Sequence, residues 1–196
     1  MLNKPRFIVI HCSDVSSKTV FDQYNSINQT HRNRGFTKSI LGGWVGYHVL
    51  ITGEKLYKCK ETWEEGCHTN QYYNDLSVNF QSLGICIGFD GDIEYPTTTQ
   101  YNLLQQQVLT WMKEFSIPKE NVKMHRFYEQ RKTCPGVLIT QEWINRLIEP
   151  PTEDVKPLPQ LTKQIEIQSQ NTIRLQIIDL AKQAVYLLKQ LLTLRK

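Results

Sequence analysis

Short runs of strand-forming residues alternate with longer segments of helical period along most of the chain. Phe7–Ile10 is a run of four apolar residues and Leu83–Phe89 reads LGICIGF, so both runs indicate buried strands. In Thr99–Phe115 apolar residues recur at helical spacing, and Pro118 then ends the predicted helix. The alternation of strands with helices predicts an α/β layer architecture.

Further elements are predicted between and after these segments. They are a helix over Thr19–Arg34, a hairpin of Tyr47–Thr52 with Lys55–Lys58, a strand over Asn121–His125 and a helix that follows Thr140. In the hairpin Gly53 supplies the turn, because glycine adopts backbone conformations that other residues resist. Thr140 offers its side-chain oxygen as the N-cap of the last helix.

The composition is that of a folded protein without a dedicated nucleic-acid surface. Hydrophobic residues make up 40% and aromatic residues 10% of the 196 residues, which is too many for a disordered polyelectrolyte. The 23 basic residues exceed the 19 acidic ones only slightly, and most of the excess lies after residue 150. Because nucleic-acid binders carry clustered positive charge, no nucleic-acid partner is expected.

The N-terminal sequence lacks the features of a secretory signal. MLNKPRFIVIHC has an apolar run of only four residues and no small-residue cleavage site. The sequence therefore predicts synthesis in the cytoplasm without a signal peptide. Five cysteines, an odd number without CxxC spacing, are expected to be thiols or ligands in that reducing compartment.

The composition changes after Glu149. Residues 150–163 are rich in proline, which is typical of a semi-rigid linker. Residues 164–196 carry apolar residues in a four-three alternation, which predicts an amphipathic C-terminal helix. A broad apolar stripe needs a surface to cover it. Packing on its own domain, self-association as a homo-oligomer and contact with a membrane surface are the three alternatives.

Two histidines and a cysteine are candidate metal ligands. His11 and His125 each end a predicted strand, and Cys134 follows His125 after a segment of eight residues. Catalytic zinc sites use three such ligands and leave the fourth position for water. The alternative to metal ligation is that the histidines lie at the surface and that the cysteine is a small buried core residue.

Six motifs occur in order along the chain. They are HCS at 11–13, HRNRGF at 31–36, GWVGYHVLI at 43–51, GCHTN at 66–70, NFQSLGICIGFDG at 79–91 and HRFYEQRKTCPG at 125–136. In order and spacing they resemble the zinc-dependent N-acetylmuramoyl-L-alanine amidases, a family that includes amidase-type phage lysozymes and peptidoglycan recognition proteins. The resemblance implies a mixed central sheet flanked by helices and a zinc amidase catalytic domain over residues 1–149.

The resemblance also implies roles for seven residues. It implies that Zn²⁺ is bound by His11, His125 and Cys134, that Tyr47 and Lys132 are catalytic, and that His31 and His68 line the substrate groove. Lys132 would stabilise the developing oxyanion, and Tyr47 would orient the attacking water or hydrogen-bond the tetrahedral intermediate. The residue types alone leave other interpretations open. Lys132 could be a solvated surface lysine and Tyr47 a structural aromatic residue of the sheet. His31 could be a positive charge at the C-terminus of a helix.

The alternation of side chains along a strand predicts which way the neighbours of Tyr47 and His11 point. His48 is expected to point away from Tyr47 and to be structural, and Cys12 is expected to face away from His11. Cys134 is then the one sulfur ligand expected.

The activity that the resemblance implies is hydrolysis of bacterial peptidoglycan at the amide bond between N-acetylmuramic acid and L-alanine. Without a signal peptide, such a protein is expected to be a phage or prophage endolysin that reaches the cell wall after membrane breach. Two alternatives stay open: a non-catalytic peptidoglycan-binding module, and an interaction protein that acts through the C-terminal helix.

Overall fold

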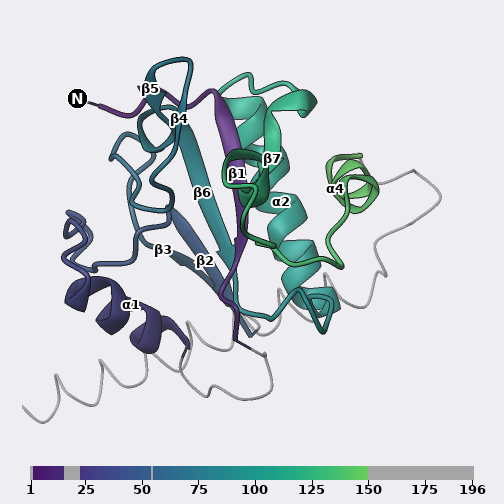
Figure 1. The fold of residues 1–196 in the computed structure, drawn as a ribbon, viewed down its shortest axis with the longest axis horizontal. Coiled ribbons are helices and arrows are strands. Elements are labelled where there is room, and N and C mark those ends of the chain that lie inside the picture. Colours follow the sequence, from purple (N-terminus) through teal and green to yellow (C-terminus); the bar gives the residue numbers. More distant parts are fainter. Residues whose placement is uncertain (1, 16–22, 54, 150–196) are drawn as a thin grey trace, which may run out of the picture. The chain divides into compact units, whose positions relative to one another are not determined.

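Five strands form one sheet in the order β3-β2-β6-β1-β7 (Figure 1). Their bounds are β1 Phe7–Cys12, β2 Val49–Thr52, β3 Lys55–Lys58, β6 Ser82–Ile87 and β7 Val122–Met124. The neighbouring pairs among β2, β6, β1 and β7 are parallel, and β3 is antiparallel to β2. This computed structural model describes residues 2–15, 23–53 and 55–149. The mixed central sheet expected from the sequence is confirmed.

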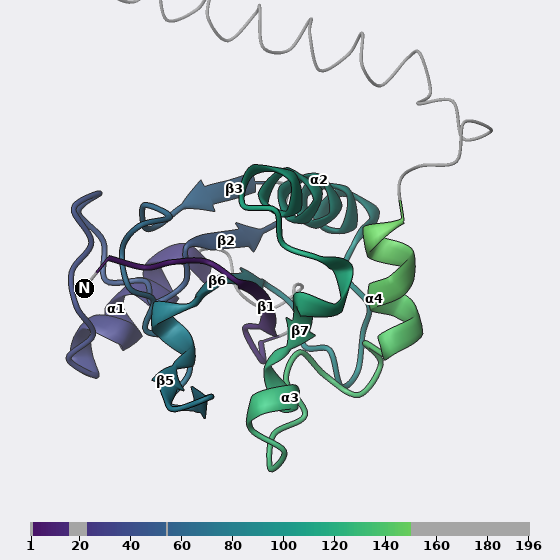
Figure 2. The same cartoon turned by 90° about the horizontal axis from the view of Figure 1, so that it is seen from above.

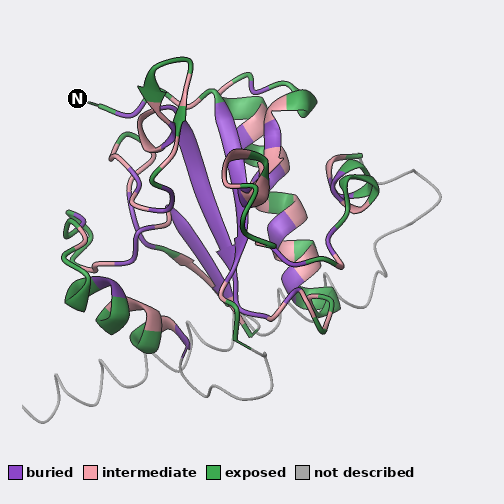
Figure 3. Ribbon diagram, viewed as in Figure 1, coloured by how far each residue is buried: buried purple, intermediate pink, exposed green. Residues whose placement is uncertain are grey.

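The adjacent strands β1 and β6 are buried along their whole length, as Figure 3 shows. Parallel strands covered on both faces are apolar without alternation, which explains the continuous runs at Phe7–Ile10 and Leu83–Phe89. The second run was predicted to continue to Phe89, but β6 already ends at Ile87. The hairpin of β2 and β3 turns at Gly53, which has a φ of 57°.

Four α-helices accompany the sheet in the described part of the chain: α1 Gln23–Asn33, α2 Thr98–Glu114, α3 His125–Tyr128 and α4 Gln141–Ile148. The smaller elements are β4 Tyr72–Tyr73, β5 Leu76–Ser77, and the 3-10 helices η1 Val78–Phe80 and η2 Lys119–Asn121. Thr140 caps α4 as predicted, since its side chain accepts a hydrogen bond from the Trp143 N–H. The helix predicted over Thr19–Arg34 is seen from Gln23, because residues 16–22 lie outside the described residues.

Apolar residues cover the two faces of the sheet in separate clusters. Ile85 and Ile87 pack in the larger cluster with residues of α2 and α4, and Figure 2 shows α2 along this face. Cys86, between them in the strand, lies in the second cluster with Tyr24 and Ile27 of α1. Because successive side chains of a strand point to opposite faces, α2 and α1 cover opposite sides of the sheet.

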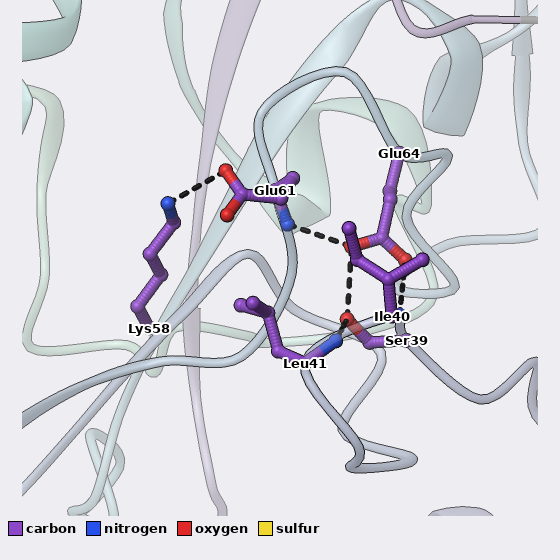
Figure 4. A network of polar contacts seen from close by, with 6 residues as sticks. All are labelled: Ser39, Ile40, Leu41, Lys58, Glu61 and Glu64. Carbon is purple, nitrogen blue, oxygen red and sulfur yellow. Dashed lines mark hydrogen bonds and ion pairs between the residues drawn. The ribbon is translucent and has the colours of Figure 1, made fainter.

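Glu64 connects two loops beside the sheet (Figure 4). Its carboxylate accepts hydrogen bonds from the Ser39 hydroxyl at 2.8 Å and from the backbone N–H groups of Ile40 and Glu61 at 3.2 and 2.8 Å. Burial alone would raise the pKa of Glu64, but these hydrogen bonds lower it below its usual value. The network fixes the segment that leads from β3 to the GCHTN motif.

The predicted linker at 150–163 and the predicted C-terminal helix at 164–196 lie outside the described residues. Among the helices that the structure describes, none is both long enough and apolar enough to span a membrane.

Candidate active site

Two histidines meet where adjacent parallel strands end. Ile10 of β1 pairs with Met124 of β7, so the next residues along the chain, His11 and His125, lie side by side. Their ring centroids are 4.5 Å apart. The predicted strand was expected to include His125, but β7 ends at Met124 and His125 begins α3. The carboxyl ends of parallel strands are a common location for ligand sites in α/β proteins.

Cys134 completes a group of three metal-binding side chains. It follows α3 in a loop that returns to β1, and its Sγ lies 3.8 Å from Nδ1 of His11. The ligand atoms of His11, His125 and Cys134 all lie within 4.8 Å of one another. In a tetrahedral zinc site, bonds of about 2.1 Å to nitrogen and 2.3 Å to sulfur place these atoms roughly 3.6 Å apart. The donor set and its spacing therefore fit a zinc ion with one open position.

The protonation of these side chains is set mainly by burial. Burial first, and then nearby His125 and His68, lowers the pKa of His11 well below its usual value. Burial and the charge of Lys132 lower the pKa of His125 to about 4. Both imidazoles are therefore neutral at pH 7, as metal ligation requires.

The thiol of Cys134 lies beside the thiol of Cys12. A hydrogen bond with Cys12 and burial raise the pKa of the Cys134 thiol well above its usual value. A thiolate here needs a cation to balance its charge. Cys12 packs with Ile8 and Ile10, on the side of β1 that alternation predicts, yet the loop brings Cys134 within reach of its thiol.

Arg126 holds the loop that carries Cys134. Its guanidinium donates hydrogen bonds to the carbonyls of Thr133 and Gly136, both at 2.7 Å, and to that of Ile139. Its backbone N–H donates to the Cys134 carbonyl at 2.9 Å. Sequence reasoning gave this residue no role, and its place directly after His125 was the one available signal.

The same loop packs against Gly91 without room for a side chain. A Cβ at Gly91 would lie 1.9 Å from the Pro135 carbonyl oxygen. We therefore expect Gly91→Ala to displace the Cys134 loop and to lower the free energy of unfolding by about 1 to 3 kcal/mol, as overpacking does. Urea unfolding measures this change. Gly43→Ala is the control, because its added carbon meets only side-chain atoms, at 3.1 and 3.2 Å; equal stability of the two variants would contradict the account.

Tyr47 lies among the histidines of the site. Its ring centroid is 5.1 Å from that of His11 and 5.6 Å from that of His31. Burial first, and then Cys86, which is hydrogen-bonded to the hydroxyl, raises the pKa of Tyr47 well above its usual value. The hydroxyl is therefore protonated at neutral pH and can donate a hydrogen bond. Cys86 was not predicted, although its pairing with His11 in the sheet places it beneath the site.

One pocket of about 640 Å³ collects the predicted site residues. Its lining includes all seven: His11, His31, Tyr47, His68, His125, Lys132 and Cys134. Lys132 is exposed on the wall, and its charge lowers the pKa values of both His11 and His125. The structure thus brings the whole predicted set to one concave surface of the size that binds small ligands.

His31 and His48 are both buried, and their ring nitrogens have different hydrogen-bond partners. Nδ1 of His31 accepts a hydrogen bond from the Gly46 N–H at 3.0 Å. Nδ1 of His48 accepts one from the Gly84 N–H at 3.0 Å, and its Nε2 donates to the Glu64 carbonyl at 3.0 Å. Burial lowers the pKa of each to about 4. His31 is therefore neutral at pH 7, although it lies in the last turn of α1.

These two pKa values predict how stability depends on pH. Unfolded histidines titrate near pH 6.5, so the unfolded chain binds more protons than the folded chain between about pH 6.5 and 4. We expect the free energy of unfolding to decrease as the pH is lowered across this window, by about 1.4 kcal/mol per pH unit for each histidine. Urea unfolding of metal-free protein at several pH values tests this. His48→Asn should reduce the slope; an unchanged stability across the window would refute the expectation.

Comparisons of the sequence and of the structure show which known proteins the chain resembles. The family described as N-acetylmuramoyl-L-alanine amidase matches residues 1–137. No curated protein sequence matches the chain. Among solved structures, N-acetylmuramoyl-L-alanine amidase LysC from Clostridium intestinale is 24% identical with a TM-score of 0.59, over 74% of this chain and 88% of that one.

Two further solved structures share the fold. A mutant endolysin from Bacillus subtilis is 24% identical with a TM-score of 0.56, over 76% of this chain and 88% of the endolysin. The bumblebee protein PGRP-SA is 18% identical with a TM-score of 0.57, over 78% of this chain and 90% of its own. With a family match over well more than half of its residues, the chain belongs to the N-acetylmuramoyl-L-alanine amidase family.

Proposed function

We propose that this protein is a zinc-dependent peptidoglycan hydrolase that cleaves the amide bond between N-acetylmuramic acid and L-alanine. One observation carries the proposal: two neutral imidazoles and a thiol converge within 4.8 Å, in the same pocket as Tyr47 and Lys132. This is the donor set of a catalytic zinc site with an open position. Membership of the amidase family gives the bond that is cleaved.

Each of these side chains has a distinct task. His11, His125 and Cys134 would hold the zinc ion, which supplies activation of water and polarisation of a carbonyl at neutral pH. The protonated Tyr47 hydroxyl would donate a hydrogen bond to the reacting oxygen. Lys132, exposed on the pocket wall, would place a positive charge where negative charge develops on the substrate carbonyl.

The pocket wall also suits the peptide part of the proposed substrate. Arg34 and Arg131 lie on its wall together with Lys132, and the acidic groups Asp14 and Glu129 line it as well. A stem peptide carries carboxylates and amides that such mixed polar walls can bind. His31, a buried residue of the pocket lining whose ring centroid lies 4.4 Å from that of Phe36, would contact this substrate.

The biological setting that we infer is that of a phage or prophage endolysin. The structures from Clostridium intestinale and Bacillus subtilis carry the names amidase and endolysin. An enzyme of this kind would reach the cell wall after membrane breach. A purely binding module, the alternative left open by the sequence, has no physical need of a thiol beside two neutral imidazoles.

Metal dependence tests the proposal. Protein loaded with zinc and then dialysed should retain about one zinc per chain and should release peptides from purified cell walls. A chelator should abolish the release, and added zinc should restore it. Binding to cell walls without any release of peptides, whatever the metal content, would favour the binding module.

A further inference from the structure

His68 lies behind the metal-binding group and faces the far side of His11. Its Nδ1 is 3.0 Å from Nε2 of His11, and the residue is only 7% exposed. The backbone around it is held by Asn79, whose side-chain oxygen accepts from the N–H groups of His68 and Thr69 at 3.1 and 3.2 Å. His68 is thus fixed against the nitrogen of His11 that does not face Cys134.

A backbone carbonyl sets the direction of the hydrogen bonds through His68. The Val78 carbonyl can only accept, so the Ser82 hydroxyl donates to it, at 2.6 Å. Ser82 Oγ must then accept from Nε2–H of His68, 3.2 Å away. A neutral His68 with its proton on Nε2 has a lone pair on Nδ1, which accepts from Nε2–H of His11.

The consequence appears at the other nitrogen of His11. With its proton on Nε2, neutral His11 carries a lone pair on Nδ1, the atom that lies 3.8 Å from Cys134 Sγ. This is the tautomer that can bind a metal ion together with Cys134 and His125. The chain from Val78 to His68 therefore selects the ligating form of His11.

Two glycines hold the His68 ring in place. A Cβ at Gly66 or at Gly84 would lie 2.5 Å from the His68 ring. The ring therefore fills a slot that exists because both positions lack a side chain. This packing holds the plane of the ring, and with it the two hydrogen bonds that the ring nitrogens make.

We propose that His68 is a positioning residue that orients His11 and fixes its ligating tautomer, in addition to the substrate contact predicted from the sequence. This inference rests on the proposed function, since it assumes that His11 binds the metal ion. Partners of this kind behind a metal-binding histidine typically contribute 10- to 100-fold to metal affinity. The sequence motif GCHTN did not reveal this role, because the partner of His68 is 57 residues away.

Zinc affinity of the full-length protein, measured by competition with a chromophoric chelator, tests the inference. His68→Ala should weaken zinc binding by about 10- to 100-fold. His68→Asn should recover part of the loss, because the amide oxygen can take the place of Nδ1 as acceptor. Ser82→Ala, which leaves the ring in place and removes its anchor, should show a smaller loss. The absorption bands of bound Co²⁺ should shift in His68→Ala.

His31→Ala is the matched control. His31 has the same 7% exposure and lines the same pocket, but its Nδ1 is bonded to the Gly46 N–H and not to a metal-binding residue. Its zinc affinity should equal that of the unmodified protein. If His68→Ala and Ser82→Ala bind zinc as tightly as His31→Ala, the positioning role is wrong while the proposed function stands. If the unmodified protein binds no zinc, both fall.

Discussion

Replacing Cys134 with serine is expected to remove the bound zinc and to lower the rate of amide hydrolysis by at least about a thousandfold. The physical reason is that a thiolate supplies the one negative charge among the three proposed ligands, and a serine hydroxyl stays neutral and binds zinc weakly. The loop should keep its place, because Arg126 holds it through backbone carbonyls and not through the sulfur. Zinc content and peptide release are the two measurements.

Cys59→Ser is the control for this substitution. Cys59 is buried, at 3% exposure; it packs in the second core cluster and donates to the Tyr57 carbonyl. This variant should keep one zinc per chain and normal hydrolysis. A Cys134→Ser protein that retains zinc and activity would show that the thiol is a small core residue and not a ligand.

Lys132→Ala is expected to lower kcat by about a hundredfold or more while zinc stays bound. Lys132 lies on the exposed wall of the pocket, and its charge already acts on both His11 and His125. An interaction made only in the transition state lowers kcat and kcat/KM together and leaves KM nearly unchanged. Steady-state kinetics on a soluble muropeptide, with zinc analysis of the same sample, separates this role from a structural one.

Lys119→Ala is the matched control, because Lys119 is an exposed lysine of η2 that does not line the pocket. It removes the same charge from the protein and should leave kcat unchanged. If Lys132→Ala reacts as fast as Lys119→Ala, the role of Lys132 in stabilising the oxyanion is wrong.

The central sheet was predictable because its strands are local signals. The apolar runs at Phe7–Ile10 and Leu83–Phe89 locate β1 and β6, and Thr140 marks the start of α4. The pairing of Ile10 with Met124 was not predictable, because a single sequence does not reveal the register between strands 114 positions apart. That pairing is what brings His11 and His125 together.

The site residues were predicted from sequence motifs. The residues that the sequence did not reveal support the site through contacts of the backbone. Arg126 binds three carbonyls, Gly66 and Gly84 make room for a ring, and the Val78 carbonyl orients a hydrogen-bond chain. None of these contacts depends on a residue pattern that periodicity can reveal. Cys12 illustrates the same limit: alternation placed it correctly on the far face, but only the folded loop brings Cys134 to its thiol.

The predicted linker and amphipathic C-terminal helix stay predictions, and so do self-association and membrane contact through residues 164–196. The described residues contain the complete set of seven predicted site residues. All the residues to which the proposed mechanism assigns a role therefore lie before residue 150.

The most direct test of the zinc amidase account is mass spectrometry of one defined muropeptide after incubation with the protein, with and without chelator. The account predicts two products, a saccharide that ends in free N-acetylmuramic acid and a peptide with a new N-terminal L-alanine, and it predicts that chelator prevents both. Cleavage at a glycosidic or peptide–peptide bond, or the same two products in the presence of chelator, would contradict it.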